Sequence, residues 1–137
     1  MNTRAPIQLG LALALALTAG ATGLHSSAVA DPAKPAPACF WARNVDGFAA
    51  TSDQRTVNLR VGVRDVYQLT LFAPCEDVDW NQTIALRSRG SDWICEGNNL
   101  DAEIDTHSPI GLERCPVTTV HKLNPAEIAA LPKGARP

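Results

Sequence analysis

Hydrophobic and polar residues alternate along the middle of the chain with the period of two that is typical of a half-buried β-strand. From residue 56 to 63, valine and leucine alternate with asparagine, arginine and glycine. A second alternating run covers residues 67–71 and stops before Pro74. The polar pair Arg64 and Asp65 lies between the two runs, so the pattern predicts a β-hairpin.

Shorter runs of the same kind predict the rest of a sheet. Residues 83–88 and 93–95 have strand patterns, and the Arg-Gly-Ser-Asp sequence at 89–92 favours a turn, which predicts a second hairpin. Strands over 40–48 and 115–123 would complete a sheet of about five or six strands. We therefore expect a mainly β fold, a small antiparallel barrel or sandwich, and an acidic turn between two strands permits an OB-like order.

Helix signals occur at two places. A short acidic segment spans residues 76–81, and the C-terminal sequence NPAEIAALP can form a helix of about one to two turns. Asn124 is a suitable N-cap, Pro125 suits the first helical position, and Glu127 lies three residues after the cap. A proline ends the run. We expect a short helix and tail over residues 124–137.

Residues 1–30 have the pattern of a secretory signal peptide. Arg4 precedes an apolar run without ionisable groups at 7–19, and residues 28–30 match the A-x-A cleavage pattern. A transmembrane anchor is disfavoured because this run is shorter than the roughly 20 residues that span a bilayer. The single arginine favours the general secretory (Sec) route. We expect cleavage after Ala30 and a periplasmic or secreted product without a transmembrane segment.

Composition limits what the mature domain can do. Residues 31–38 contain three prolines and should form an extended leader, followed by one β domain over 39–123. Without residues 1–30, the chain carries 11 basic and 14 acidic side chains, a net charge of −3. This balance lacks the basic surface that nucleic acid binding requires, so we expect no nucleic acid partner.

The cysteines Cys39, Cys75, Cys95 and Cys115 are separated by 36, 20 and 20 residues. These spacings contain no C-x-x-C motif and no close pair for a zinc site. An even number of cysteines in a small exported domain predicts two disulfides, and a metal site or a free reactive thiol is the alternative. Three pairings are possible. The predicted second hairpin favours Cys75 with Cys95, which leaves Cys39 with Cys115.

Four segments of the chain carry these cysteines and their flanking strands: CFWARNVDGF, VYQLTLFAPCEDVDW, IALRSRGSDWICEG and LERCPVTTV. In this series the chain resembles domain of unknown function 6491, a family of small exported proteobacterial proteins. The resemblance covers residues 39–131. It implies a Gram-negative origin and a disulfide-stapled β domain, and it implies no activity and no catalytic residue.

Known catalytic motifs are missing from the sequence. His107 and His121 lie 14 residues apart without an H-E-x-x-H pairing, and there is no G-x-S-x-G. Residues 77–81 begin like a calcium-binding loop, but Gln82 replaces the glycine of its turn and Ser88 replaces its closing glutamate. We expect no metal and no cofactor. The enzymatic alternative is a small cell-envelope hydrolase that uses one of the histidines with nearby acids.

Three tryptophans, Trp41, Trp80 and Trp93, lie close to polar or charged residues in the sequence. Each is either a core residue with its indole N–H at the edge, or part of an exposed surface that grips a sugar, peptide or protein. We favour a non-enzymatic binding or interaction module that uses the loops at 76–81 and 89–92. Its partner would be an envelope protein, a peptide or a glycan, and a purely structural envelope subunit is the other alternative. The candidate binding residues are Trp80, Trp93, Glu76, Asp77 and Asp79.

Overall fold

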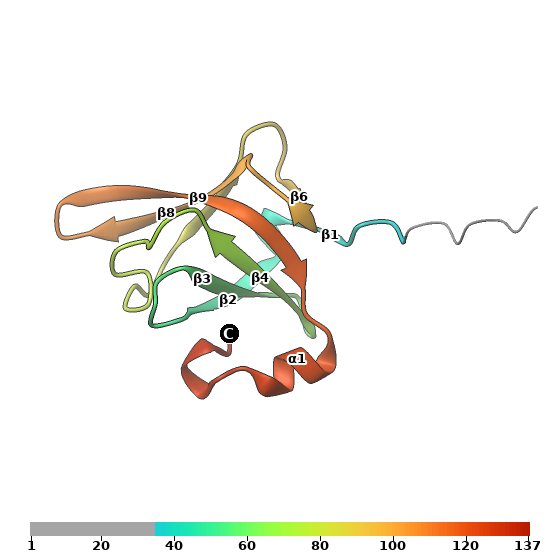
Figure 1. Ribbon diagram of the computed structural model, residues 1–137. Helices are drawn as coiled ribbons and strands as arrows, with labels where there is room; N and C mark the ends of the chain where they lie inside the picture. Colours follow the sequence, from blue (N-terminus) through green and yellow to red (C-terminus); the bar gives the residue numbers. More distant parts are fainter. Residues whose placement is uncertain (1–34) are drawn as a thin grey trace, which may run out of the picture. The chain divides into compact units, whose positions relative to one another are not determined.

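The computed structural model describes residues 35–137, so the predicted signal peptide and the first part of the leader lie outside the described residues. Two antiparallel sheets, one short helix and two 3-10 turns make up this part of the chain (Figure 1). The strands are β1 (Cys39–Trp41), β2 (Val45–Ala50), β3 (Thr56–Val61), β4 (Asp65–Leu71), β5 (Ala85–Ser88), β6 (Trp93–Cys95), β7 (Gly97–Asn98), β8 (Ala102–Ser108) and β9 (Gly111–Lys122). The helical segments are η1 (Ala42–Asn44), α1 (Pro125–Ala130) and η2 (Lys133–Ala135).

The larger sheet has the strand order β2-β3-β4-β9-β8-β5, and β7 also pairs with β9. β1 and β6 form a separate two-stranded sheet. The larger sheet curls into a half-barrel (Figure 1). Its register shifts between Val45 and Gly47 and between Thr70 and Leu71, and such bulges bend and twist strands. The prediction of a mainly β, antiparallel fold is confirmed. β2 and β5 are the two edge strands and do not pair with each other, so the sheet does not close into a barrel.

The hydrophobic core lies on one face of the larger sheet. Val57 and Leu59 of β3, Leu69 of β4, and Val117 and Val120 of β9 are almost completely removed from solvent. Burial of one such side chain contributes about 1.5 to 3 kcal/mol. The alternating pattern of β3 and β4 therefore reflects one apolar face turned toward the core, and the predicted β3–β4 hairpin is confirmed.

The opposite face of these strands carries a row of polar residues. Asn58, Gln68 and His121 are directly paired across β3, β4 and β9, so their side chains share a face. Asn58 is completely buried, donates from Nδ2 to the carbonyl of Ala135 at 2.8 Å, and accepts from Gln68 Nε2 at 3.1 Å. A buried amide without partners is unfavourable. These hydrogen bonds therefore hold η2 against the sheet.

The C-terminal helix α1 begins as predicted. Asn124 Oδ1 accepts from the backbone N–H groups of Ala126 and Glu127 at 2.9 and 3.0 Å, and the Glu127 carboxylate accepts from the Asn124 N–H at 2.7 Å. This reciprocal capping box satisfies N–H groups that the first turn leaves free. Between residues 35 and 137, no helix combines the length and the apolar character that crossing a bilayer requires.

The predicted second hairpin is wrong, because β5 pairs with β8 and β6 pairs with β1. Residues 89–92 do connect two strands, but burial selects the partner of each strand. Phe40 of β1 lies opposite Ile94 of β6, and both belong to the core. β8 has only two apolar residues, Ala102 and Ile104, and two polar residues, Asp105 and Thr106, are buried beside them, so its sequence does not have a sustained apolar alternation.

Two other predicted elements differ from the structure. The strand at 40–48 is interrupted by η1, which separates β1 from β2. The segment 76–81, which carries a helix signal in the sequence, forms a series of turns and no helix. Asp77 has a φ of +57°, the left-handed region, through which a right-handed helix does not continue.

The structure contains two disulfides, the number predicted, but the predicted pairing is wrong: Cys39 bonds Cys95, and Cys75 bonds Cys115. The error follows from the incorrect hairpin, because β6 places Cys95 directly opposite Cys39 of β1. Cys75 follows β4, whose neighbour β9 carries Cys115. Cys75 and Cys115 are buried in the core, whereas Cys39 and Cys95 are half-buried.

Candidate binding site

The loop at residues 75–81, here called the 75–81 loop, is anchored at three points. Cys75 is bonded to β9 through its disulfide, and Val78 is completely buried in the core. Asn81 donates from Nδ2 to the Thr106 hydroxyl at 2.6 Å and to a second acceptor in β8, a backbone carbonyl, at 2.9 Å. With both ends and the middle held, the side chains between them are presented from a supported backbone.

A second loop, the 51–55 turn between β2 and β3, is bonded to the 75–81 loop. Gln54 Nε2 donates to Asp79 Oδ1 at 3.0 Å, and the Gln54 carbonyl accepts from the Cys75 N–H at 2.9 Å. In residues 35–137, Gln54 and Asp77 are the only residues other than glycine with a positive φ, at 58° and 57°. Such conformations cost roughly 1 kcal/mol or more and persist where the surroundings impose them. Gln54 is held by its contacts with the 75–81 loop. Within that loop, the Asp77 carbonyl accepts from the Trp80 and Asn81 N–H groups.

The 51–55 turn also fixes an acidic side chain. The Thr51 hydroxyl donates a hydrogen bond to Asp53, and the Arg55 backbone N–H donates to Asp53 Oδ1 at 3.0 Å. These two hydrogen bonds lower the pKa of Asp53 below its ordinary value because they stabilise the carboxylate, and the bond from Thr51 has the larger effect. Asp53 therefore stays negatively charged at neutral pH.

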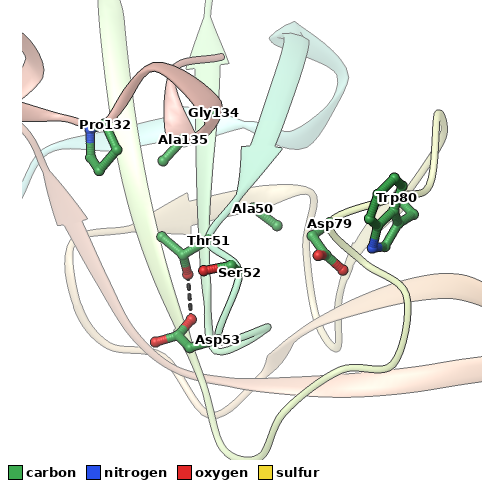
Figure 2. A pocket seen from close by; sticks show the side chains of 9 residues that line it. All are labelled: Ala50, Thr51, Ser52, Asp53, Asp79, Trp80, Pro132, Gly134 and Ala135. Carbon is green, nitrogen blue, oxygen red and sulfur yellow. Dashed lines mark hydrogen bonds between the residues drawn. The ribbon is translucent and has the colours of Figure 1, made fainter.

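A cavity of about 440 Å³ lies beside these two loops and the C-terminal segment (Figure 2). Its lining comprises residues 50–53, residues 79–80, Pro132, Gly134 and Ala135. Figure 2 shows Asp79 and Trp80 next to each other, with Pro132 and Ala135 across the view. Trp80 is 81% exposed and, in the described part of the chain, has no aromatic partner.

Two of the five candidate binding residues, Asp79 and Trp80, line this cavity. Asp77 shapes the loop through its backbone, Glu76 is exposed outside the lining, and Trp93 lies beside a different concavity. The alternative that places Trp80 in the core is wrong. Asp53 and the C-terminal residues of the lining were not among the residues predicted from the sequence. The run Thr-Ser-Asp at positions 51–53 is a turn signal, but nothing local indicates that this turn faces residue 79.

Trp93 has an aromatic partner, which Trp80 does not have among the described residues. Its ring packs against Trp41 with centroids 4.7 Å apart in an edge-to-face arrangement, and the Arg43 guanidinium lies 4.9 Å above the Trp41 ring. Trp41 and Trp93 are 39% and 42% exposed. A concavity of about 350 Å³ beside Trp93 is lined by both basic and acidic residues, among them Arg89 and Asp101.

His121 lies between two carboxylates. Its Nδ1 is 2.8 Å from Glu96 Oε1, and its Nε2 is 3.3 Å from Glu127 Oε1. These hydrogen bonds raise the pKa of His121, and the bond to Glu96 has the larger effect. The pKa of Glu96 is lowered by the Lys122 backbone N–H and then by His121. The pKa of Glu127 is lowered by the Asn124 backbone N–H and then by His121. Both ring nitrogens face carboxylates, so neither faces a hydroxyl or thiol nucleophile.

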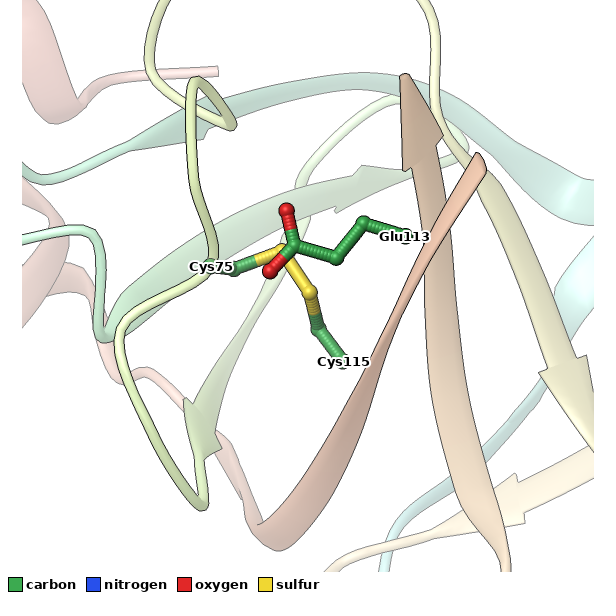
Figure 3. A group of neighbouring side chains, drawn as sticks. All are labelled: Cys75, Glu113 and Cys115. Atoms are coloured by element: carbon green, nitrogen blue, oxygen red, sulfur yellow. A yellow bond between two sulfur atoms is a disulfide. The ribbon is translucent and has the colours of Figure 1, made fainter. Parts of the chain in front are cut away.

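Within residues 35–137, one group of side chains has the composition of a metal site: Cys75, Glu113 and Cys115 (Figure 3). Its two sulfurs are bonded to each other, so neither is available as a thiolate ligand. Glu113 Oε2 is buried beside this disulfide and has no hydrogen-bond partner within the part of the chain that the structure describes. The acidic side chains of the 75–81 loop do not form such a group in the described part of the chain.

Similarity to known proteins identifies the family of this chain but no activity. No functionally curated protein and no solved structure matches the chain. One family model, described as "Family of unknown function (DUF6491)", matches residues 3–137 and confirms the resemblance found in the sequence. The chain therefore belongs to the Family of unknown function (DUF6491).

Proposed function

We propose that this protein is an exported ligand-binding domain whose binding site is the cavity beside Asp79 and Trp80. The exposure of Trp80 is the main support for this function. A large aromatic side chain, 81% exposed, extends from a loop that is anchored at three points. Tryptophan in such a position offers a large contact area with few rotatable bonds to freeze, which favours binding.

The proposed location is the periplasm or the extracellular space. Two disulfides support it, because disulfides persist in oxidising compartments. The signal pattern of residues 1–30 supports export by the Sec route with cleavage after Ala30. The intact mass of the protein recovered after export tests this cleavage directly.

The two alternative functions have less support. A hydrolase needs a base that reaches a nucleophile, and both ring nitrogens of His121 are paired with carboxylates instead. His107 is exposed, and the contact with Asn81 involves its backbone carbonyl. A purely structural subunit would have no binding site for small molecules at the cavity, which distinguishes it from the proposed function.

Nuclear magnetic resonance can test binding at the cavity, because each indole N–H gives its own signal. The ¹⁵N-labelled exported protein is titrated separately with N-acetylglucosamine, n-butylammonium, butyrate and n-butanol. We expect at least one of these to shift the Trp80 indole and the Ser52 and Gly134 amides saturably, with smaller changes at Trp93.

Two matched variants serve as controls. Trp80→Ala should weaken the saturable shifts of Ser52 and Gly134, whereas Trp93→Ala should preserve them. The proposed function is wrong if none of the four compounds produces a saturable shift at the cavity, or if Trp80→Ala leaves the shifts unchanged.

A further inference from the structure

The charges that line the cavity all have one sign. Two of its nine lining residues, Asp53 and Asp79, are acidic, and none is basic. Within residues 35–137, neither carboxylate forms an ion pair. The cavity therefore contains two carboxylates that form no ion pair in this part of the chain, although the Arg55 charge acts on Asp53 from outside the lining.

The two carboxylates also keep hydrogen-bonding capacity. The hydrogen bonds from Thr51 and Arg55 both reach Oδ1 of Asp53, and the bond from Gln54 reaches Oδ1 of Asp79. Across the described residues, Oδ2 of each carboxylate has no protein partner. Each aspartate can thus accept further hydrogen bonds from a ligand.

Hydrogen-bond donors are scarce at the same place. The Thr51 hydroxyl already donates to Asp53, which leaves the Ser52 hydroxyl and the Trp80 indole N–H as the side-chain donors of the lining. A sugar hydroxyl both donates and accepts, so it matches a lining with both kinds of group. An alkylammonium group donates three hydrogen bonds and a guanidinium group five, and neither accepts any. A lining rich in acceptors matches these cations better than a sugar.

The uncharged part of the lining fits the rest of such a ligand. The face of a tryptophan ring attracts a cation within about 6 Å of its centroid, and Trp80 has no such partner in residues 35–137. Ala50, Pro132 and Ala135 supply apolar surface. Methylene chains that carry a charged end pack on surfaces of this kind.

We infer that this cavity binds a positively charged alkyl group, an alkylammonium or alkylguanidinium, with the charge beside Asp53, Asp79 and the face of the Trp80 ring and the chain against the apolar part of the lining. This inference depends on the proposed function, because it names the ligand class of the same site. Two sources carry this chemistry: a free amine, or a lysine or arginine side chain of a peptide.

The decisive comparison is between n-butylammonium and n-butanol, which have the same alkyl chain and differ in charge. We expect n-butylammonium to shift the Trp80 indole with a Kd about tenfold lower than that of n-butanol, from two exposed charge contacts and one cation–π contact. Its affinity should fall as salt is raised from about 0.01 M to about 0.15 M, because the screening length shortens from about 30 Å to about 8 Å. The n-butanol affinity should not change.

Charge-removing variants locate the effect. Asp79→Asn and Asp53→Asn should each weaken n-butylammonium binding about two- to fivefold, the size of one exposed ion pair, and leave n-butanol binding unchanged. Asp101→Asn, at the concavity beside Trp93, is the matched control and should have no effect. Asparagine keeps an acceptor oxygen at each position, and the spectrum of each variant reports whether it folds.

A lysine-containing peptide, acetyl-Gly-Lys-Gly-amide, separates the two sources. Tighter binding of this peptide than of n-butylammonium identifies a peptide side chain as the ligand, and equal or weaker binding identifies a free amine. If n-butanol, N-acetylglucosamine or butyrate binds at the Trp80 indole as tightly as n-butylammonium, the cation inference is wrong and the binding function stands. If no compound binds there, both are wrong.

Discussion

The 75–81 loop and the β1–β6 sheet each combine a disulfide with tryptophan, in opposite arrangements. In the loop, the Cys75–Cys115 disulfide is buried, and Trp80 extends into solvent with no aromatic partner among residues 35–137. In the β1–β6 sheet, the Cys39–Cys95 disulfide is half-buried, and Trp93 packs against another indole.

The difference follows from the backbone at each place. In β1 and β6, residues two apart point to the same face, so the register that pairs Cys39 with Cys95 also pairs Trp41 with Trp93. The 75–81 loop has no such register. Its anchors lie at the core and at β8, and the tip carries Trp80 outward. Strand pairing thus gives Trp93 an aromatic partner, whereas the anchored loop leaves the ring of Trp80 accessible from solvent.

The largest expected difference between the two regions is in disulfide reduction. A reductant can reach Cys39–Cys95 in the folded state, whereas reduction of Cys75–Cys115 requires the core to open. With a free energy of unfolding of at least about 5 kcal/mol, the buried disulfide should be reduced at least about 1,000-fold more slowly. Peptide mapping by mass spectrometry, after timed exposure to a phosphine reductant and alkylation, measures both rates. In concentrated guanidinium chloride the two rates should converge, and equal rates under native conditions would contradict the comparison.

The next effect concerns stability. Trp93→Ala removes an edge-to-face contact and should lower the free energy of unfolding by about 1 to 2 kcal/mol. Trp80→Ala removes an exposed ring and should change it by less than about 0.5 kcal/mol. Urea denaturation of both variants measures these values. A loss for Trp80→Ala as large as that for Trp93→Ala would mean that Trp80 supports the fold.

The smallest effect concerns pH and involves the end of β6, where Glu96 follows Cys95 and binds His121. The pKa of His121 is raised in the folded state, so its contribution to stability is complete below its ordinary value of 6.5 and is lost as pH rises through the raised pKa. The pKa values of Glu96 and Glu127 are lowered, so their contribution is present above 4.5 and is lost as pH falls through the lowered values. The cluster should stabilise the fold most between about pH 4.5 and 6.5.

The melting temperature measured from pH 5.5 to 8.5 tests this dependence. The wild type should lose stability as pH rises above 6.5, and His121→Gln should show a flatter profile. His107→Gln is the control, because the hydrogen bond at that residue involves its backbone carbonyl, and it should follow the wild type. Parallel profiles for the wild type and His121→Gln would show that the cluster does not control the pH dependence.

Several elements could be predicted from the sequence because their causes are local. The β3–β4 hairpin follows from alternation along the chain, and α1 follows from a cap and a proline within four residues, Asn124–Glu127. β8 could not be predicted in this way, because its buried Asp105 lies 2.7 Å from Arg87 of β5, a partner 18 positions earlier in the chain. For the same reason, Trp80 and Asp79 could be named as candidates, but their neighbour Asp53 could not.

By itself, the sequence determined the mainly β class, the short C-terminal helix and the presence of two disulfides, because alternation, capping and cysteine number depend on each residue and its near neighbours. Only the tertiary structure decided which cysteines pair, which strand joins β6, and which side chains face the cavity. These features depend on contacts between residues far apart in the chain. The burial of Phe40 against Ile94 selects the partner of β6, and the Gln54 contacts bring the 51–55 turn to the 75–81 loop.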